Sequence, residues 1–228
     1  MNRSLPNVAA VLVAIIVALV LFGAKLTSGG SRPLSEPVAA PLVDATASSP
    51  ADDTAVFAGG CFWGIEAVFE HVKGVKSAVS GYAGGNVANP SYEQVSSGDT
   101  GHAESVQVIY DPSQVSYGKL LQIFFSVAHD PTQLNRQGPD HGTQYRSALF
   151  YNNAQQQQIA ESYIKQLTAA KTFSRPIVTQ VTRLRAFYPA ESYHQDYLVH
   201  HPNQLYIVIN DQPKVAALKK QFPDIYRN

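Results

Sequence analysis

The sequence contains one cysteine, Cys61, one tryptophan, Trp63, and one methionine. A single cysteine excludes an internal disulfide and a metal site built from a cysteine cluster. The 228 residues are enough for one medium domain whose core needs no disulfide or metal. The thiol of Cys61 is therefore either a small buried apolar group or a reactive one.

Charge of neither sign predominates, because 17 Lys and Arg residues balance 17 Asp and Glu residues. Binding to a nucleic-acid backbone requires a basic surface, so the composition does not favour a nucleic-acid partner. Seven histidines are present, including the pair His200-His201, but no two have the spacing of a zinc-protease or zinc-finger site. We therefore expect no bound metal ion.

One long apolar run, VAAVLVAIIVALVLFGA at residues 8–24, lies between Arg3 and Lys25. Its length is at the lower limit for a membrane-spanning helix and slightly above that of a signal-peptide core. No convincing A-x-A cleavage site ends it, since Phe22 would occupy the minus-three position for cleavage after Ala24. We expect residues 1–25 to form an uncleaved anchor, with a cleaved signal peptide and secretion as the main alternative and a soluble helix as a third. Positive charge ahead of the run predicts a membrane-anchored domain in the periplasm or another extracytoplasmic space.

Residues 26–53 are rich in Ser, Ala and Pro, which favours a linker that buries little apolar area. We expect the folded domain at residues 54–228, with alternating strands and helices. This alternation predicts an α+β fold, arranged as a two-layer α/β sandwich. Strands are expected at 55–58, 75–83, 104–110, 146–151, 177–184 and 205–209, and helices at 62–72, 120–127, 159–167, 190–199 and 215–222.

Cys61 lies in the motif GCFWG, residues 60–64, where a predicted strand meets a predicted helix. Free N–H groups and the helix dipole at a helix start favour thiolate over thiol. Two glycines before Cys61 allow a sharp turn that leaves its sulfur accessible. Adjacent rings point in different directions on a helix, so Phe62 or Trp63 can line a pocket for a methyl group or thioether. The motif therefore favours a reactive thiol.

Glu104 is the second unusual residue. It shares strand parity with Val106, Val108 and Tyr110, which we expect to form the buried face. An ionised carboxyl on an apolar face is costly, so its pKa rises and it keeps a proton near neutral pH. That is the property of a general acid. The alternative is that Glu104 ends the strand and points to water.

Three further regions supply candidate binding residues. Residues 140–145, DHGTQY, offer several hydrogen-bonding groups, including His141. Tyr82 and Tyr92 lie in Gly- and Pro-rich surroundings that are typical of binding loops. Taken singly, each of these residues is more typical of a surface or boundary position.

The motifs together resemble the A-type peptide methionine sulfoxide reductases. Six motifs in the family's order carry the resemblance, from about Thr54 to the C-terminus: GCFWG at 60–64, GYAGG at 81–85, NPSY at 89–92, SGDTGHAE at 97–104, DHGTQYRS at 140–147 and FYPAE at 187–191. The resemblance implies a ferredoxin-like core within the two-layer sandwich. A catalytic domain of this kind needs no partner subunit, so we expect a monomer.

The resemblance also implies roles for individual residues. Cys61 is the nucleophile that attacks the sulfur of methionine S-sulfoxide, free or within oxidised proteins, and Glu104 donates a proton to the departing oxygen. The remaining roles concern the substrate: Tyr92, Tyr145 and, through water, Asp140 bind the oxygen, Phe62 and Trp63 enclose the methyl group, and Tyr82, His141 and Glu191 are secondary candidates.

The chain departs from many relatives in having no second cysteine. In those relatives the second thiol converts the sulfenic acid into an internal disulfide that thioredoxin reduces. Here the resemblance implies no bound cofactor and resolution by an external thiol, from a thioredoxin-like protein, glutaredoxin with glutathione, or dithiothreitol. With an N-terminal anchor, such an enzyme would repair oxidised methionine in envelope proteins.

Two other functions remain open at this point. A cysteine hydrolase or acyltransferase would pair Cys61 with a histidine base such as His141 or His194. A tethered redox sensor or methionine-sulfoxide binder would need the reactive thiol without multiple turnover.

Overall fold

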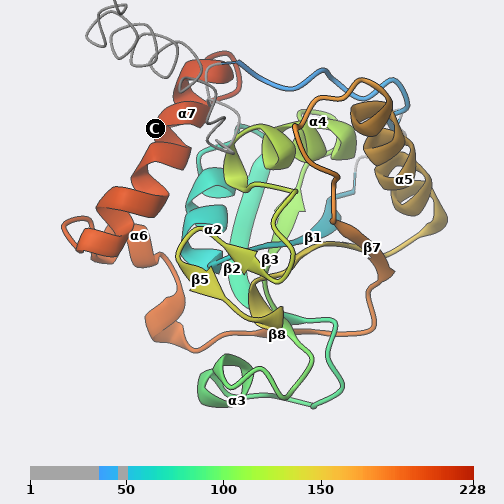
Figure 1. The fold of residues 1–228 in the computed structure, drawn as a ribbon. Helices are drawn as coiled ribbons and strands as arrows, with labels where there is room; N and C mark the ends of the chain where they lie inside the picture. Colours follow the sequence, from blue (N-terminus) through green and yellow to red (C-terminus); the bar gives the residue numbers. More distant parts are fainter. Residues whose placement is uncertain (1–35, 46–50) are drawn as a thin grey trace, which may run out of the picture. The chain divides into compact units, whose positions relative to one another are not determined.

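The sequence folds around a six-stranded sheet in the computed structural model, which describes residues 36–45 and 51–228 (Figure 1). Both ranges belong to one structural unit, Arg32–Asn228. The predicted anchor at residues 8–24 lies outside the described residues. Within the described ranges, no helix combines the length and apolar character needed to cross a bilayer.

The strand order of the sheet is β7-β6-β1-β3-β2-β8. β1 pairs antiparallel with both β3 and β6, β2 pairs antiparallel with β3 and β8, and only the β6–β7 pair is parallel. The strands span Asp53–Gly59 (β1), Val75–Ala83 (β2), Ala103–Tyr110 (β3), Ser147–Tyr151 (β6), Gln180–Arg183 (β7) and Phe187–Pro189 (β8).

The inner part of this unit has the ferredoxin-like topology. Helix α2 (Phe62–Glu70) connects β1 to β2, and helix α4 (Tyr117–Ile123) lies between β3 and β6. The resulting β-α-β-β-α-β order, with β6-β1-β3-β2 across the sheet, is the split βαβ arrangement. The predicted two-layer α/β sandwich with a ferredoxin-like core is confirmed.

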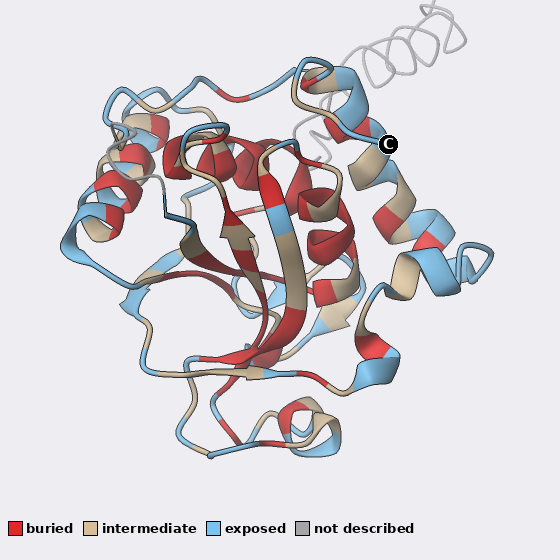
Figure 2. Ribbon diagram, turned by 180° about the vertical axis from the view of Figure 1, so that it is seen from behind, coloured by how far each residue is buried: buried red, intermediate tan, exposed pale blue. Residues whose placement is uncertain are grey.

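Side-chain alternation along the strands gives the sheet two different faces. Ala55 and Phe57 of β1 point into the main core with the helices, whereas Val56 and Ala58 point into a smaller cluster on the opposite face. Figure 2 shows the buried residues concentrated in the central strands and the helices packed on them. Burial of each large apolar side chain contributes roughly 1.5–3 kcal/mol, so this core is the main source of stability.

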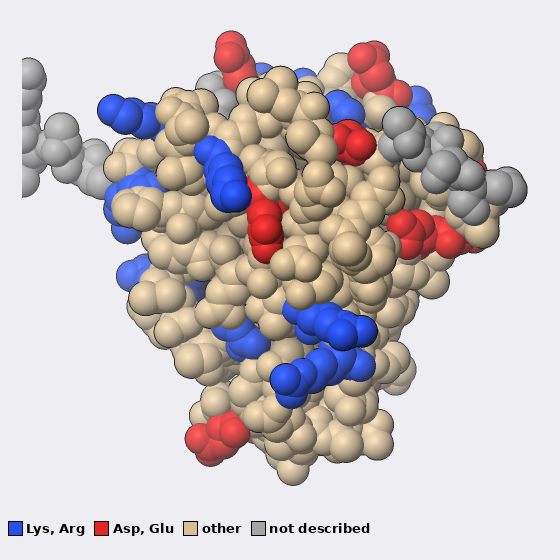
Figure 3. Space-filling model, turned by 90° about the vertical axis from the view of Figure 1, so that its right-hand side faces the viewer, with Lys and Arg blue, Asp and Glu red and all other residues tan. Residues whose placement is uncertain are grey.

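The remaining elements complete the described chain. They are helix α3 (Tyr92–Ser96), π-helix η1 (Phe124–Ala128), the small hairpin β4 (Arg136–Gln137) and β5 (Asp140–His141), 3-10 helix η2 (Thr143–Tyr145), helix α5 (Ala154–Ala169), 3-10 helix η3 (Ser192–His194), helix α6 (Tyr197–His200), π-helix η4 (Ile207–Asp211) and helix α7 (Gln212–Gln221). The face that carries α5 and β7 is largely uncharged, with separate small groups of basic and acidic side chains (Figure 3).

The predicted strand at 205–209 is wrong, because this segment is helical and continues into α7. Ile207 is buried, whereas Val208 and Ile209 are exposed, and the next buried residue is Asp211. Packing at a helical interval therefore overrides the β propensity of the apolar run. The helix predicted at 190–199 is also interrupted, since Asp196 adopts a left-handed conformation with φ 51° between η3 and α6.

Part of the predicted linker packs against the domain. Val38 is 2% exposed; its N–H donates to Ser126 Oγ at 3.0 Å, and its carbonyl accepts from Gln122 Nε2 at 2.8 Å. The Tyr163 hydroxyl donates to the carbonyl of Ala39 at 2.7 Å. Residues 36–45 therefore differ from the expected free tether, because side chains of the domain hydrogen-bond to the backbone of Val38 and Ala39.

Candidate active site

Cys61 lies at the N-cap of α2, with φ −54° and ψ 126°. The chain reaches it through Gly60, whose φ of +102° is rarely adopted by residues with a side chain. A Cβ at Gly60 would also lie 2.5 Å from Gln137 Cβ. Two constraints therefore require glycine at this turn, and together they place the sulfur at the helix start.

The charge state of Cys61 differs from the prediction. The side chain is 8% exposed, and burial raises the pKa of the thiol well above its ordinary value, with further increases from Glu104 and Asp211. A hydrogen bond from the Trp63 backbone and the charge of Lys214 lower the pKa without reversing the shift. In the resting site, desolvation outweighs the helix start, and Cys61 is a protonated thiol.

Glu104 is buried on β3, as its strand parity predicts, with 2% exposure. Its Oε2 accepts the N–H of Phe62, the residue after Cys61, at 3.1 Å. Burial raises the pKa of the carboxyl to about 8; the Phe62 hydrogen bond opposes this shift, and Asp140 and Asp211 add to it. The carboxyl therefore holds a proton at neutral pH and is available as an acid.

Three tyrosine hydroxyls share this electrostatic environment. They belong to Tyr92 at the start of α3, Tyr145 at the end of η2, and Tyr206 immediately before η4. Burial raises the pKa of all three, and the nearby Asp140 carboxylate raises each further. All three hydroxyls therefore keep their protons, and those of Tyr92 and Tyr145 can donate hydrogen bonds close to the sulfur.

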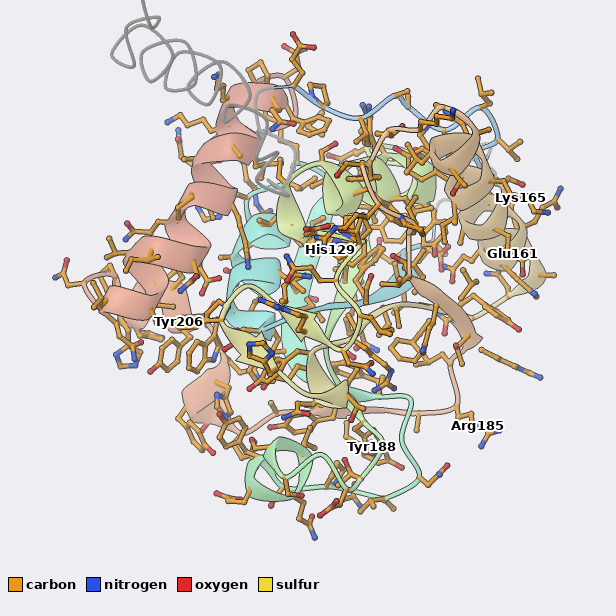
Figure 4. The ribbon with its side chains drawn as sticks, in the orientation of Figure 1. His129, Glu161, Lys165, Arg185, Tyr188 and Tyr206 are labelled. Carbon is orange, nitrogen blue, oxygen red and sulfur yellow. The ribbon has the colours of Figure 1, made fainter. Side chains whose placement is uncertain are left out.

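Asp140 binds a partner that the sequence did not suggest. The Tyr206 hydroxyl donates to Asp140 Oδ2 of strand β5. Figure 4 labels Tyr206 next to the helical segment that begins α7. Tyr206 was not predicted as a site residue because its segment was expected to be a strand, although an aromatic residue with a polar hydroxyl inside an apolar run is itself a weak signal of a site.

Trp63 presents the accessible aromatic surface. It stacks on Tyr197 with ring centroids 3.7 Å apart and planes 5° apart, and it meets Tyr206 edge-on at 5.9 Å. Its Nε1 donates to His194 Nδ1 at 3.2 Å. Phe62 has no exposed surface, so it supports the site from within the core and Trp63 offers a face to a ligand. Tyr197 was missed for a different reason from Tyr206, since the break at Asp196 within the predicted helix 190–199 was not expected.

Tyr82 and Glu191 form a support for α3. Tyr82 is fully buried on β2, and its hydroxyl donates to Glu191 Oε2 at 2.9 Å. Glu191 Oε1 accepts the backbone N–H of Tyr92, also at 2.9 Å. These two predicted secondary residues therefore orient Tyr92.

His141 is exposed on β5, and no histidine in the described ranges hydrogen-bonds to Cys61. A hydrolase would need such a base beside the thiol. Across the same ranges, no group of three or more His, Cys, Asp or Glu side chains suits a metal ion. The geometry is that of a thiol and a neutral acid surrounded by hydroxyl donors.

Replacement of Glu104 by Gln should change how stability depends on pH. Between its ordinary value of 4.5 and about 8, the carboxyl is ionised in the unfolded chain and protonated in the folded one. Its contribution to the free energy of unfolding therefore falls as pH rises through this window. Relative to that of the parent, the free energy of unfolding of E104Q should rise by on the order of 3 kcal/mol between about pH 5 and about pH 8, because one pKa unit corresponds to about 1.4 kcal/mol.

Urea unfolding over this pH range measures the difference. E161Q, which removes an exposed carboxyl of α5, is the matched control and should follow the parent. Parallel curves for parent and E104Q would show that Glu104 is ionised in the folded protein.

Known proteins match the same part of the chain. The family model for peptide methionine sulfoxide reductase matches residues 53–225. Peptide methionine sulfoxide reductase MsrA 2 of Mesorhizobium japonicum is 60% identical over 179 residues, which are 78% of this chain and 92% of the relative. Its namesake from Synechocystis is 50% identical over 195 residues, 84% of this chain and 91% of the relative.

Two solved structures resemble this fold. Reduced Mxr1 from Saccharomyces cerevisiae has a TM-score of 0.62 and 35% identity, covering 67% of this chain and 87% of that chain. Methionine sulfoxide reductase A of Corynebacterium diphtheriae has a TM-score of 0.61 and 37% identity, covering 77% of this chain and 88% of that chain. From the matched motifs, the shared fold and these identities, the chain belongs to the peptide methionine sulfoxide reductase family.

Proposed function

We propose that this enzyme reduces the S epimer of methionine sulfoxide, peptide-bound or free, to methionine. The observation that carries the proposal is the only thiol of the chain at the start of α2, with the neutral Glu104 carboxyl bound to the next backbone N–H. Removal of the oxygen from a sulfoxide requires a nucleophile and an acid that lie close together.

The reaction transfers one oxygen atom. Cys61 Sγ attacks the sulfoxide sulfur and forms an S–S bond while Glu104 protonates the sulfoxide oxygen. The hydroxyl then passes from the substrate sulfur to Sγ, so the S–O bond of the substrate and the new S–S bond both break. Methionine leaves, and Cys61 becomes a sulfenic acid, Sγ–OH. The thiol proton replaces the one that Glu104 gave, so thiol plus sulfoxide yields sulfenic acid plus thioether. Cys61 is oxidised and the substrate sulfur is reduced.

The surrounding side chains bind the two ends of the sulfoxide group. The hydroxyls of Tyr92 and Tyr145, both protonated, donate hydrogen bonds to its oxygen and stabilise the charge that develops there. Asp140 accepts a hydrogen bond from the Tyr206 hydroxyl, and Tyr206 in turn packs edge-on against Trp63. The Trp63 face, held by Tyr197 and His194, contacts the methyl group, because methyl and sulfur contacts with aromatic rings are favourable.

Regeneration requires an external thiol, since the chain has no second cysteine. A first thiol attacks the sulfenic sulfur, water leaves, and a mixed disulfide forms on Cys61. A second thiol breaks that disulfide and restores the Cys61 thiol. A thioredoxin-like protein, glutaredoxin with glutathione, or dithiothreitol in vitro supplies the two thiols.

Turnover separates this function from a redox sensor or a sulfoxide binder. With a chiral methyl sulfoxide and dithiothreitol, product should accumulate beyond one equivalent of enzyme, and C61S should form none. E104Q should turn over about 10²–10⁴-fold more slowly, the usual contribution of a general acid. E161Q, the same change at an exposed position on α5, should retain the parent rate. A parent reaction that stops at one equivalent, or E104Q at the parent rate, would contradict the proposal.

The apolar run at residues 8–24 supports a membrane-anchored location for the protein. We infer an N-terminal anchor with the catalytic domain on the extracytoplasmic side, where it would repair oxidised methionine in envelope proteins; secretion after cleavage is the alternative. Cell fractionation with intact-mass analysis should recover the full-length chain in the membrane fraction. Full-length chain in the cytosolic fraction would contradict the anchor, and a shortened chain in the periplasm or medium would favour cleavage.

A further inference from the structure

An ion pair from the C-terminal helices packs against the first turn of α2. Lys214 Nζ of α7 donates to Asp211 Oδ1 of η4 at 3.0 Å. A Cβ added to Gly64 would lie 2.1 Å from Asp211 Oδ1 and 2.8 Å from Lys214 Nζ. α7 and α2 lie side by side, as Figure 1 shows. The second glycine of the GCFWG motif therefore makes room for this pair, only three residues after Cys61.

The pair is buried at a cost that packing alone does not explain. Asp211 is 0% exposed, and its Oδ2 has no hydrogen-bond partner within the described residues. The Lys214 side chain is 16% exposed. Buried ion pairs are seldom more stabilising than apolar side chains of the same size, so their retention points to a need for charge at that position.

The charged surroundings of Cys61 show what that charge does. Among the groups that shift the pKa of its thiol, Lys214 is the one cation and lowers the pKa, whereas the acidic side chains of Glu104 and Asp211 raise it. The other titratable groups of this cluster include one further acid: Tyr92, Tyr145 and Tyr206 face Cys61, the neutral imidazole of His129 faces Lys214, and Asp140 acts on Asp211.

We propose that Lys214, held by Asp211 in the space left by Gly64, is a positioning residue that stabilises the thiolate form of Cys61. The thiolate is needed twice in the proposed function. It is the nucleophile toward the sulfoxide sulfur, and it is the leaving group when the second external thiol attacks the mixed disulfide. A chain without a resolving cysteine depends on the second step for every turnover. The proposal rests on the proposed function for these uses, whereas the effect on the thiolate is independent of it.

The test measures the thiolate directly. Cys61 is the only thiol of the chain, so its alkylation by iodoacetamide reports its ionisation without any sulfoxide. In K214Q, the amide can keep a hydrogen bond to Asp211 but has no charge. Its alkylation rate at neutral pH should fall about tenfold, with the midpoint of the pH profile raised by about one unit. K214M should behave in the same way, and K214R should restore the parent profile.

Two controls separate charge from structure. K220Q removes an exposed lysine of the same helix and should leave the profile unchanged. Thermal unfolding identifies any variant that fails to fold, and the K214Q–K214R comparison holds if K214M is lost. A folded K214Q with the parent profile, or a folded K214R as slow as K214Q, would overturn the proposal. If the profile shifts as expected but the parent reduces no sulfoxide, only the proposed function fails.

Discussion

The hydrogen bond from the Phe62 amide to the Glu104 carboxyl joins the two chemical groups of the site. It connects the start of α2 to the start of β3, through two residues that lie 42 positions apart in the chain. The bond satisfies one of the free N–H groups at the helix start, for which Cys61 supplies no side-chain cap. The same contact brings an acid to the residue next to the nucleophile, so local helix geometry and catalytic geometry depend on one interaction.

Burial sets the protonation states of the two reactive groups. Desolvation keeps both Cys61 and Glu104 protonated in the resting site, which avoids two uncompensated negative charges in the core. The charged pair beside them, Asp211 and Lys214, is neutral in sum. The site therefore holds protons ready for transfer at low electrostatic cost, and a sulfoxide oxygen is the group that can accept one.

Much of the fold and the central pair of residues could be predicted from sequence, because local patterns determine them. Period-two alternation identified the buried face of β3, including Glu104, and helical spacing identified α2 after Cys61. The surroundings could not be predicted in the same way. Tyr197 and Tyr206 reach Trp63 only through the packing of α6 and η4 on α2, and the apolar run around Tyr206 favours a strand by local propensity. The thiol pKa was likewise mispredicted, since desolvation by distant segments is not visible in a helix-start motif.

The account depends most directly on the protonation state of Glu104. Infrared difference spectra between the parent and E104Q, recorded from about pH 5 to about pH 10, isolate the carboxyl band of this residue. The account predicts that the band of the protonated acid persists at neutral pH and is lost with a midpoint of about 8. Loss of that band near the ordinary carboxyl value of about 4.5 would show an ionised Glu104 and contradict its role as the acid.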